Sequence, residues 1–162
     1  MKNIYTLKDA LTFNPTGKKY NAVARIATLK EITQHKEYFV FDFEKLAKDG
    51  TIYKICKHGD EDLIQGLVAV KPSKGILDCA NMETNKINKA PLSLHSGIGK
   101  SIIALCCKIS FDLGFEGFIC FESKNRLMKY YMRYGAQNIS GLRMFIDTEN
   151  ARKLVNLYFE NA

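Results

Sequence analysis

The sequence contains no pair of cysteines spaced as C-x-x-C, and its five cysteines are an odd number. Disulfide frameworks use even sets of cysteines and most zinc sites use close pairs, so this pattern argues against both and predicts no bound metal. Most of these cysteines lie inside apolar runs, where a free thiol behaves as a small hydrophobic side chain. We therefore expect core cysteines at Cys56, Cys79, Cys106, Cys107 and Cys120.

Long apolar runs are also missing. No run approaches the roughly 18 residues that a membrane-spanning helix needs, and the first residues, MKNIYTLKDALTF, lack the apolar centre of a secretory signal. The sequence therefore predicts a cytoplasmic protein that makes no use of a membrane.

Internal repeats and low-complexity segments are absent as well, and the chain of 162 residues has only three prolines. Hydrophobic residues make up 46% and charged residues 25%, a composition typical of globular proteins rather than of fibrous or disordered ones. A chain of this length can bury enough surface for one self-sufficient core. We expect a single domain over residues 1–162.

The charge is unbalanced toward the basic side, with a formal net charge of +7. This favours a polyanionic ligand or partner, such as a phosphorylated cofactor or a nucleic acid. The lysines are scattered along the whole chain, however, so a solvated basic surface is the simpler explanation. Nucleic-acid binding needs aromatic and basic residues interleaved on an exposed strand, and residues 118–121 have too few charges nearby. We rank that function last.

Runs rich in β-branched and aromatic residues predict most of the strands. Residues 51–56, 63–70 and 76–82 are separated by two strong turn signals, which predicts an antiparallel meander. Alternation also predicts strands at residues 20–28 and 38–43, followed by a short helical turn that ends at Gly50.

The second half of the chain alternates helices and strands. Apolar residues at helical spacing predict a largely buried helix that leads up to Gly114. Residues 115–122 and 142–147 have strand character, Ser123 is placed to cap a helix that ends before Gly135, and Thr148 opens a last helix over residues 148–160. Together these elements predict an α/β (α+β) fold, in which a mixed sheet carries helices on its faces.

A glycine-rich loop precedes the predicted buried helix, in the stretch LHSGIGKS. Its GKS does not complete a Walker A motif, because Leu94 stands where that motif needs glycine, and Ile102 replaces the third glycine of a dinucleotide-binding fingerprint. Two glycines that open a helix can still present free amides and the positive end of the helix dipole to a pyrophosphate. A plain flexible entry into a core helix explains them equally well.

The order of elements resembles that of the GNAT superfamily of N-acetyltransferases, over roughly residues 63–147. That superfamily binds acetyl-CoA through a Q/R-x-x-G-x-G/A motif, and its next helix commonly carries a tyrosine four residues before a glycine. Leu94 to Gly99 occupies the motif here, with Leu94 in place of Gln or Arg, and Tyr131 lies four residues before Gly135. Residues 1–50 diverge from the pattern.

The resemblance implies the acyl-CoA N-acyltransferase (GNAT) fold, with a mixed, largely antiparallel central sheet and helices on both faces. It also implies that the strands at 76–82 and 118–122 splay apart to admit the pantetheine arm of acetyl-CoA. The pyrophosphate would then rest on amides of the glycine loop. The expected cofactor-binding residues are Met82, His95, Ser96, Gly97, Ile98, Gly99 and Lys100.

The resemblance further implies transfer of an acetyl group from acetyl-CoA to a primary amine by direct attack in a ternary complex. Tyr131 is then the expected acid that protonates the departing thiolate, and Glu83 the first choice of base, with Glu122 second and bound water as a further alternative.

A different class of function stays open, because Leu94 departs from the motif. The same fold could serve as a non-catalytic module that binds CoA or a protein partner. The sequence does not identify the amine acceptor. It also leaves open whether the chain forms a homodimer.

Overall fold

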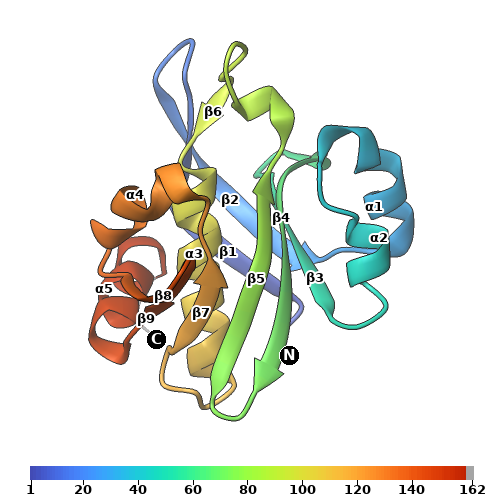
Figure 1. The fold of residues 1–162 in the computed structure, drawn as a ribbon. Helices are drawn as coiled ribbons and strands as arrows, with labels where there is room; N and C mark the ends of the chain where they lie inside the picture. The colour runs from blue at the N-terminus through green and yellow to red at the C-terminus, as the bar shows by residue number, and fades with distance from the viewer. Residues whose placement is uncertain (160–162) are drawn as a thin grey trace.

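The computed structural model describes residues 1–159, apart from the side chain of Asn125. Its described strands form one sheet in the order β6-β1-β2-β3-β4-β5-β7-β9-β8 (Figure 1). The strands are β1 (Ile4–Phe13), β2 (Lys18–Ile26), β3 (Thr51–Lys57), β4 (Asp60–Ser73), β5 (Ile76–Thr84), β6 (His95–Ser96), β7 (Ile119–Glu122), β8 (Gln137–Ser140) and β9 (Arg143–Ile146). The α-helices are α1 (Leu29–His35), α2 (Phe43–Leu46), α3 (Ile98–Asp112), α4 (Met128–Met132) and α5 (Thr148–Tyr158), and the 3-10 turns are η1 (Lys36–Tyr38), η2 (Lys86–Asn88) and η3 (Asn125–Leu127).

The predicted meander is confirmed, because β3, β4 and β5 pair antiparallel in sequence order. The predicted mixed sheet is confirmed too, since β5 and β7 run parallel while the other neighbours are antiparallel. The predicted last helix is α5, whose start is capped by the side chain of Asp147, which accepts from the Asn150 N–H, rather than by Thr148. Glu160, the last residue of that prediction, lies outside the described residues.

The strand predicted over residues 38–43 is wrong. This stretch forms η1, a bend and the start of α2. Phe39 and Phe43 are both buried and stand four residues apart, a spacing that suits a helical turn as well as an alternating strand. The carboxylate of Asp42 accepts a hydrogen bond from the Lys45 N–H and caps α2, which settles the competition in favour of the helix.

Other parts of the prediction also differ from the structure. Strands β1, β6 and β8 and helix α1 had no counterpart in the sequence-based prediction. Helix α1 begins with a capping box, in which Thr28 and Glu31 satisfy each other's backbone N–H groups. Ser123 does not cap a helix: its hydroxyl donates to the Lys124 carbonyl, and η3 comes before the short α4.

The two faces of the sheet carry different helices (Figure 1). Helices α3 and α5 pack on one face against a large apolar core that extends from β1 to β9. Helices α1 and α2 cover the other face over a smaller cluster, made of Ile32, Phe39, Phe43, Ile52, Cys56, Ile64 and Leu67. The five cysteines are free and buried, which confirms them as core residues. No helix within residues 1–159 is long and apolar enough to cross a membrane.

Candidate functional site

Strands β5 and β7 separate soon after they meet. Their parallel ladder joins Leu77 to Ile119 and Asp78 to Cys120, and no further pair follows among the described residues, although β5 continues to Thr84. The divergence opens a cavity of about 280 Å³. Its walls come from β5, η2, α3, β7, η3 and α4, from residues that follow η2 and β7, and from the segment before α2. The lining residues are Phe41, Ala80, Met82, Glu83, Thr84, Asn88, Lys89, Gly99, Ile102, Glu122, Lys124, Arg126, Leu127 and Tyr131.

The free edge of β5 faces this gap. The Asn85 N–H donates to the Gln65 carbonyl on β4, and the register pairs Glu83 with Leu67. Backbone groups of successive residues in a strand point to opposite edges. The amides and carbonyls of Met82 and Thr84 therefore point away from β4, toward the gap beside β7. This edge can pair with an extended ligand, as a further strand would.

The N-terminus of α3 borders the same cavity through Gly99. Gly97 is the N-cap, and no side chain caps the helix. The first-turn N–H groups of Ile98, Gly99 and Lys100 have no partner inside the helix, and the helix dipole places partial positive charge beside them. Lys89, Lys124 and Arg126 line the cavity as well. The arrangement suits a phosphorylated ligand.

The two glycines of the loop do different things. Gly97 has a φ of +90°, and a Cβ there would lie 2.5 Å from the carbonyl oxygen of Ala10, so this glycine lets the loop pack closely against β1. A Cβ at Gly99 would meet nothing closer than the Tyr131 hydroxyl, at 3.9 Å. Gly97 therefore serves the fold, whereas Gly99 faces the cavity.

Tyr131 comes from α4 and lines the cavity with its hydroxyl near Gly99. Its ring packs edge-on against Phe121 of β7 and against Tyr130, with centroids 5.1 Å and 5.2 Å away. Burial raises the pKa of Tyr131. The phenol therefore keeps its proton at neutral pH.

The structure does not bring His95 and Ser96 to the cavity. They form β6, which pairs with Thr12 and Phe13 of β1. The His95 backbone N–H donates to Asn88 Oδ1 at 2.9 Å, so that amide is already used. The imidazole is buried, and burial together with the charge of Lys57 lowers the pKa of His95.

The side chain of Lys100 also points elsewhere. Its Nζ lies 4.6 Å from the ring centroid of Tyr134 and 5.8 Å from that of Tyr158, so cation–π contacts hold the charge beside α4 and α5. Lys100 can therefore contribute its amide to the α3 terminus, with its charge directed toward these rings.

Glu83 lies in the cavity wall, where its side chain is 3% exposed. One carboxylate oxygen accepts the Val40 N–H at 2.7 Å, the other accepts the Phe41 N–H at 2.9 Å, and Lys89 Nζ lies 3.7 Å away. These contacts engage both oxygens of the predicted base. Its role as a base stays a prediction.

Several cavity residues were missed from the sequence. Lys124 and Arg126 had a usable signal, because they are basic residues directly after a predicted strand that was expected to splay. Asn88 and Lys89 lie in a polar stretch with no motif. Phe41 gave no signal, because its segment has strand-like alternation.

Comparison with known proteins identifies the fold. No family model and no curated protein matches the sequence. Among solved structures, the "IAA acetyltransferase" of Bacillus cereus superimposes with a TM-score of 0.59 at 11% identity, over 77% of this chain and 98% of that one. A Bacillus subtilis acetyltransferase in complex with CoA gives 0.54 at 13% identity, over 76% and 97%.

The N-terminal third also has a structural counterpart. An uncharacterized protein from Bacillus halodurans superimposes with a TM-score of 0.64 at 8% identity, over 95% of both chains. Identities this low show the fold alone. The chain has the GNAT fold, as the sequence predicted.

Proposed function

We propose that this chain transfers an acetyl group from acetyl-CoA to a primary amine. The observation that carries the proposal is the meeting of three features at one cavity. These are the unpaired edge of β5 at Met82 and Thr84, the uncapped start of α3 at Gly99, and the buried phenol of Tyr131. The fold it shares with several acetyltransferases supports the same conclusion.

The residues present fit acetyl-CoA as the acyl donor. The amides of Ile98, Gly99 and Lys100 suit the pyrophosphate, and the basic side chains of Lys124 and Arg126 add favourable charge. The β5 edge suits the amide groups of the pantetheine arm. Of the seven predicted binding residues, Met82, Ile98, Gly99 and Lys100 keep a donor-binding role in this proposal, whereas His95, Ser96 and Gly97 support the loop.

The reaction needs few groups once both substrates are held in one cavity. The amine nitrogen bonds to the thioester carbonyl carbon, the carbon–sulfur bond breaks, and the thiolate takes the proton of the Tyr131 hydroxyl. The amine releases its own proton to a base. Glu122 and water in the cavity are the alternatives to Glu83 for that proton, since both Glu83 oxygens already accept hydrogen bonds.

Two measurements test the proposal. Isothermal titration with acetyl-CoA measures donor binding, and a thiol-release assay over a panel of primary amines measures turnover. We expect both to be positive. Binding without amine-dependent thiol release would overturn the enzymatic proposal in favour of a non-catalytic CoA-binding module, for which Leu94 in place of Gln or Arg is the favouring observation. Absence of binding would overturn both.

A further inference from the structure

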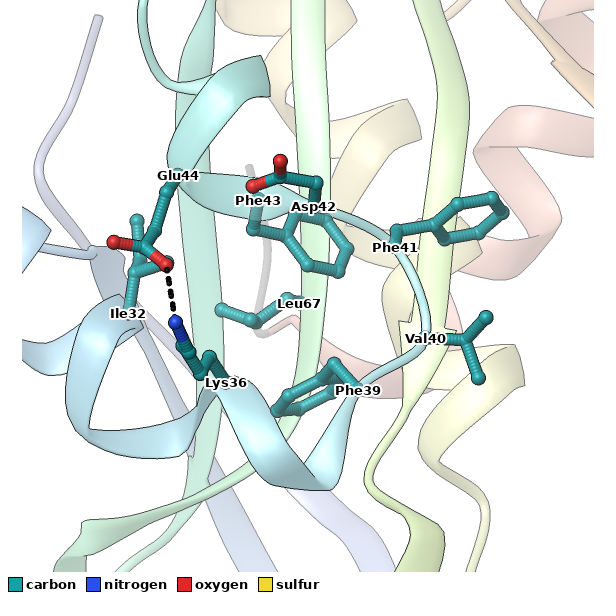
Figure 2. A pocket seen from close by; sticks show the side chains of 9 residues that line it. All are labelled: Ile32, Lys36, Phe39, Val40, Phe41, Asp42, Phe43, Glu44 and Leu67. Atoms are coloured by element: carbon teal, nitrogen blue, oxygen red, sulfur yellow. Dashed lines mark ion pairs between the residues drawn. The ribbon is translucent and has the colours of Figure 1, made fainter.

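Residues 39–41, between η1 and the N-cap residue of α2, lie beside two cavities. One is the cavity beside β5, and the other is a hollow of about 200 Å³ under α1 and α2. Figure 2 shows Phe39 and Phe43 pointing into the second hollow, whereas Phe41 extends to the opposite side. Phe41 contributes to the walls of both hollows.

The position of Phe41 rests on backbone contacts to Glu83. Neighbouring amides, those of Val40 and Phe41, donate to separate oxygens of one buried carboxylate. An ionised carboxylate is an acceptor with two oxygens, and a buried one must be paired and hydrogen-bonded. Lys89 supplies the neighbouring positive charge. We call this arrangement of Glu83 with the Val40 and Phe41 amides the clasp.

The clasp joins the segment to the strand that borders the cavity. Glu83 sits on β5 between Met82 and Thr84, whose backbone groups face the gap. The Phe41 ring is supported from behind by an edge-on contact with Phe43, with centroids 6.1 Å apart. Strand β5 and the segment are therefore held in one fixed arrangement.

We propose that Glu83 is a positioning residue and that Phe41 is a specificity-determining residue for the amine acceptor. This inference rests on the proposed function. In this proposal the start of α3 takes the donor phosphates. Phe41 enters the same cavity from the segment on the other face of the sheet, and we assign that part of the cavity to the acceptor. The clasp fixes the Phe41 ring there, and the ring limits the bulk of the substituent beside the reacting amine.

The clasp and the general base make different demands on Glu83. Glu83→Gln removes a base, but it also leaves only one acceptor oxygen and turns an NH₂ group toward the second backbone N–H. Both roles therefore predict lower activity for this variant. They differ in the kinetic constant affected, because a base acts on kcat and its pH profile, whereas a positioning contact acts on the acceptor KM.

A backbone variant separates the two roles further. Val40→Pro removes the Val40 N–H and leaves the Glu83 carboxylate chemically intact. Phe39, the preceding residue, has φ −129° and ψ 145°, which is the conformation that a residue before proline prefers. Val40→Ala is the matched control, since it trims the side chain of a residue that is 88% exposed and retains the N–H.

We expect Val40→Pro and Glu83→Gln to raise the acceptor KM about tenfold, the equivalent of one lost hydrogen bond to a charged group. The kcat pH profile and the affinity for acetyl-CoA should keep their wild-type form, and Val40→Ala should keep the wild-type acceptor KM. The inference is overturned if Glu83→Gln lowers kcat and removes its low-pH limb while Val40→Pro behaves like Val40→Ala.

Phe41→Ala tests the specificity role. The ratio of kcat/KM for a bulky primary amine over a small one should rise about tenfold relative to the wild type, since a hydrophobic pocket discriminates one or two methylene groups by this order. Phe41→Leu, which keeps an apolar side chain, should give an intermediate ratio. An unchanged ratio in Phe41→Ala overturns the specificity role.

Hydrogen exchange distinguishes failure of the inference from failure of the proposed function. In the free protein, the Val40 and Phe41 amides should exchange at least tenfold faster in Glu83→Gln than in the wild type. If they do not, the clasp is wrong whatever the activity. If they do, and no amine promotes thiol release by the wild type, the proposed function fails and the specificity role falls with it.

Discussion

The two faces of the sheet are built in different ways. On one face, α3 is buried along most of its length and packs with α5 into a core shared by strands from β1 to β9. On the other face, the short helices α1 and α2 cover a smaller cluster and are joined by an irregular segment. Two hydrogen bonds to Glu83 fix that segment to β5.

The cavity is lined by residues from both sides: from α3 and α4, and from the segment that joins α1 and α2. The proposed donor side consists of a helix terminus and a strand edge, whose backbone groups are positioned by regular secondary structure. The proposed acceptor side includes Phe41, whose backbone N–H is held by a single carboxylate. Backbone groups suit a donor that is always the same molecule. A side chain on an irregular segment, in contrast, can be replaced by mutation without disturbing the core, which suits a variable acceptor.

The largest expected effect concerns Gly97, on the α3 side. Alanine at a φ of +90° is strained, and its Cβ would lie 2.5 Å from the Ala10 carbonyl oxygen. We expect Gly97→Ala to lower the free energy of unfolding by about 2–4 kcal/mol. Urea unfolding followed by circular dichroism measures it. A loss below 1 kcal/mol would show that the loop can move away from β1, and the contrast between the two faces would weaken.

Replacing Tyr131 tests the chemistry at the border between the two faces. Tyr131→Phe removes the proton that the thiolate needs, so kcat should fall about 100-fold, which corresponds to about 2.7 kcal/mol. The affinity for acetyl-CoA and the urea midpoint should change little, because the ring packing against Phe121 remains. Tyr130→Phe is the control from the same helix. A Tyr131→Phe variant with wild-type kcat would remove the acid assignment.

The same contrast explains what the sequence could predict. The β3–β5 meander and α3 were predicted because each has a strong local pattern: turn signals between β-rich runs, and an apolar arc at helical spacing. The glycine loop was placed correctly before the buried helix. On the other face, Phe39 and Phe43 satisfied a strand pattern and a helical pattern at once, and only the Asp42 cap and their shared burial decide between them.

The residues of the candidate site also differ in how far the sequence could predict them. Gly99 and Tyr131 were predicted from the resemblance, through the glycine motif and the tyrosine four residues before Gly135, and the structure brings them together. The location of Glu83 at the gap followed from its place directly after the predicted strand at 76–82, although β5 extends to Thr84. Its hydrogen-bond partners could not be predicted, because they lie 42 and 43 residues away in sequence and are backbone amides, which leave no trace in residue type.

Replacing Gly99 should have a smaller effect, which concerns ligand affinity rather than stability. It lies in the first turn of α3, where alanine is a better helix former than glycine, so Gly99→Ala should leave stability unchanged or raise it by up to about 1 kcal/mol. The added methyl group would stand beside the amides and the Tyr131 hydroxyl. We expect the affinity for acetyl-CoA to fall about tenfold in isothermal titration, since a close backbone approach is blocked. Unchanged affinity would contradict a donor site at this terminus.

The smallest expected effect is a pH dependence of stability from His95, which lies where the glycine loop joins β1. Burial and Lys57 lower the pKa of His95, so the folded state holds this proton less tightly than the unfolded chain does. The contribution to stability is therefore intact above the unfolded pKa of about 6.5, and it is lost as the pH falls through 6.5 toward the lowered folded value.

The test compares urea midpoints of the wild type and His95→Gln between pH 8 and pH 5. Glutamine does not titrate, so the wild type should lose more stability than the variant as the pH falls. Parallel curves would contradict the prediction. They would also mean that the ring of His95 becomes exposed to solvent at low pH. The sheet would then be less rigid at β6 than in the core under α3, and β6 would resemble the less regular face that α1 and α2 cover.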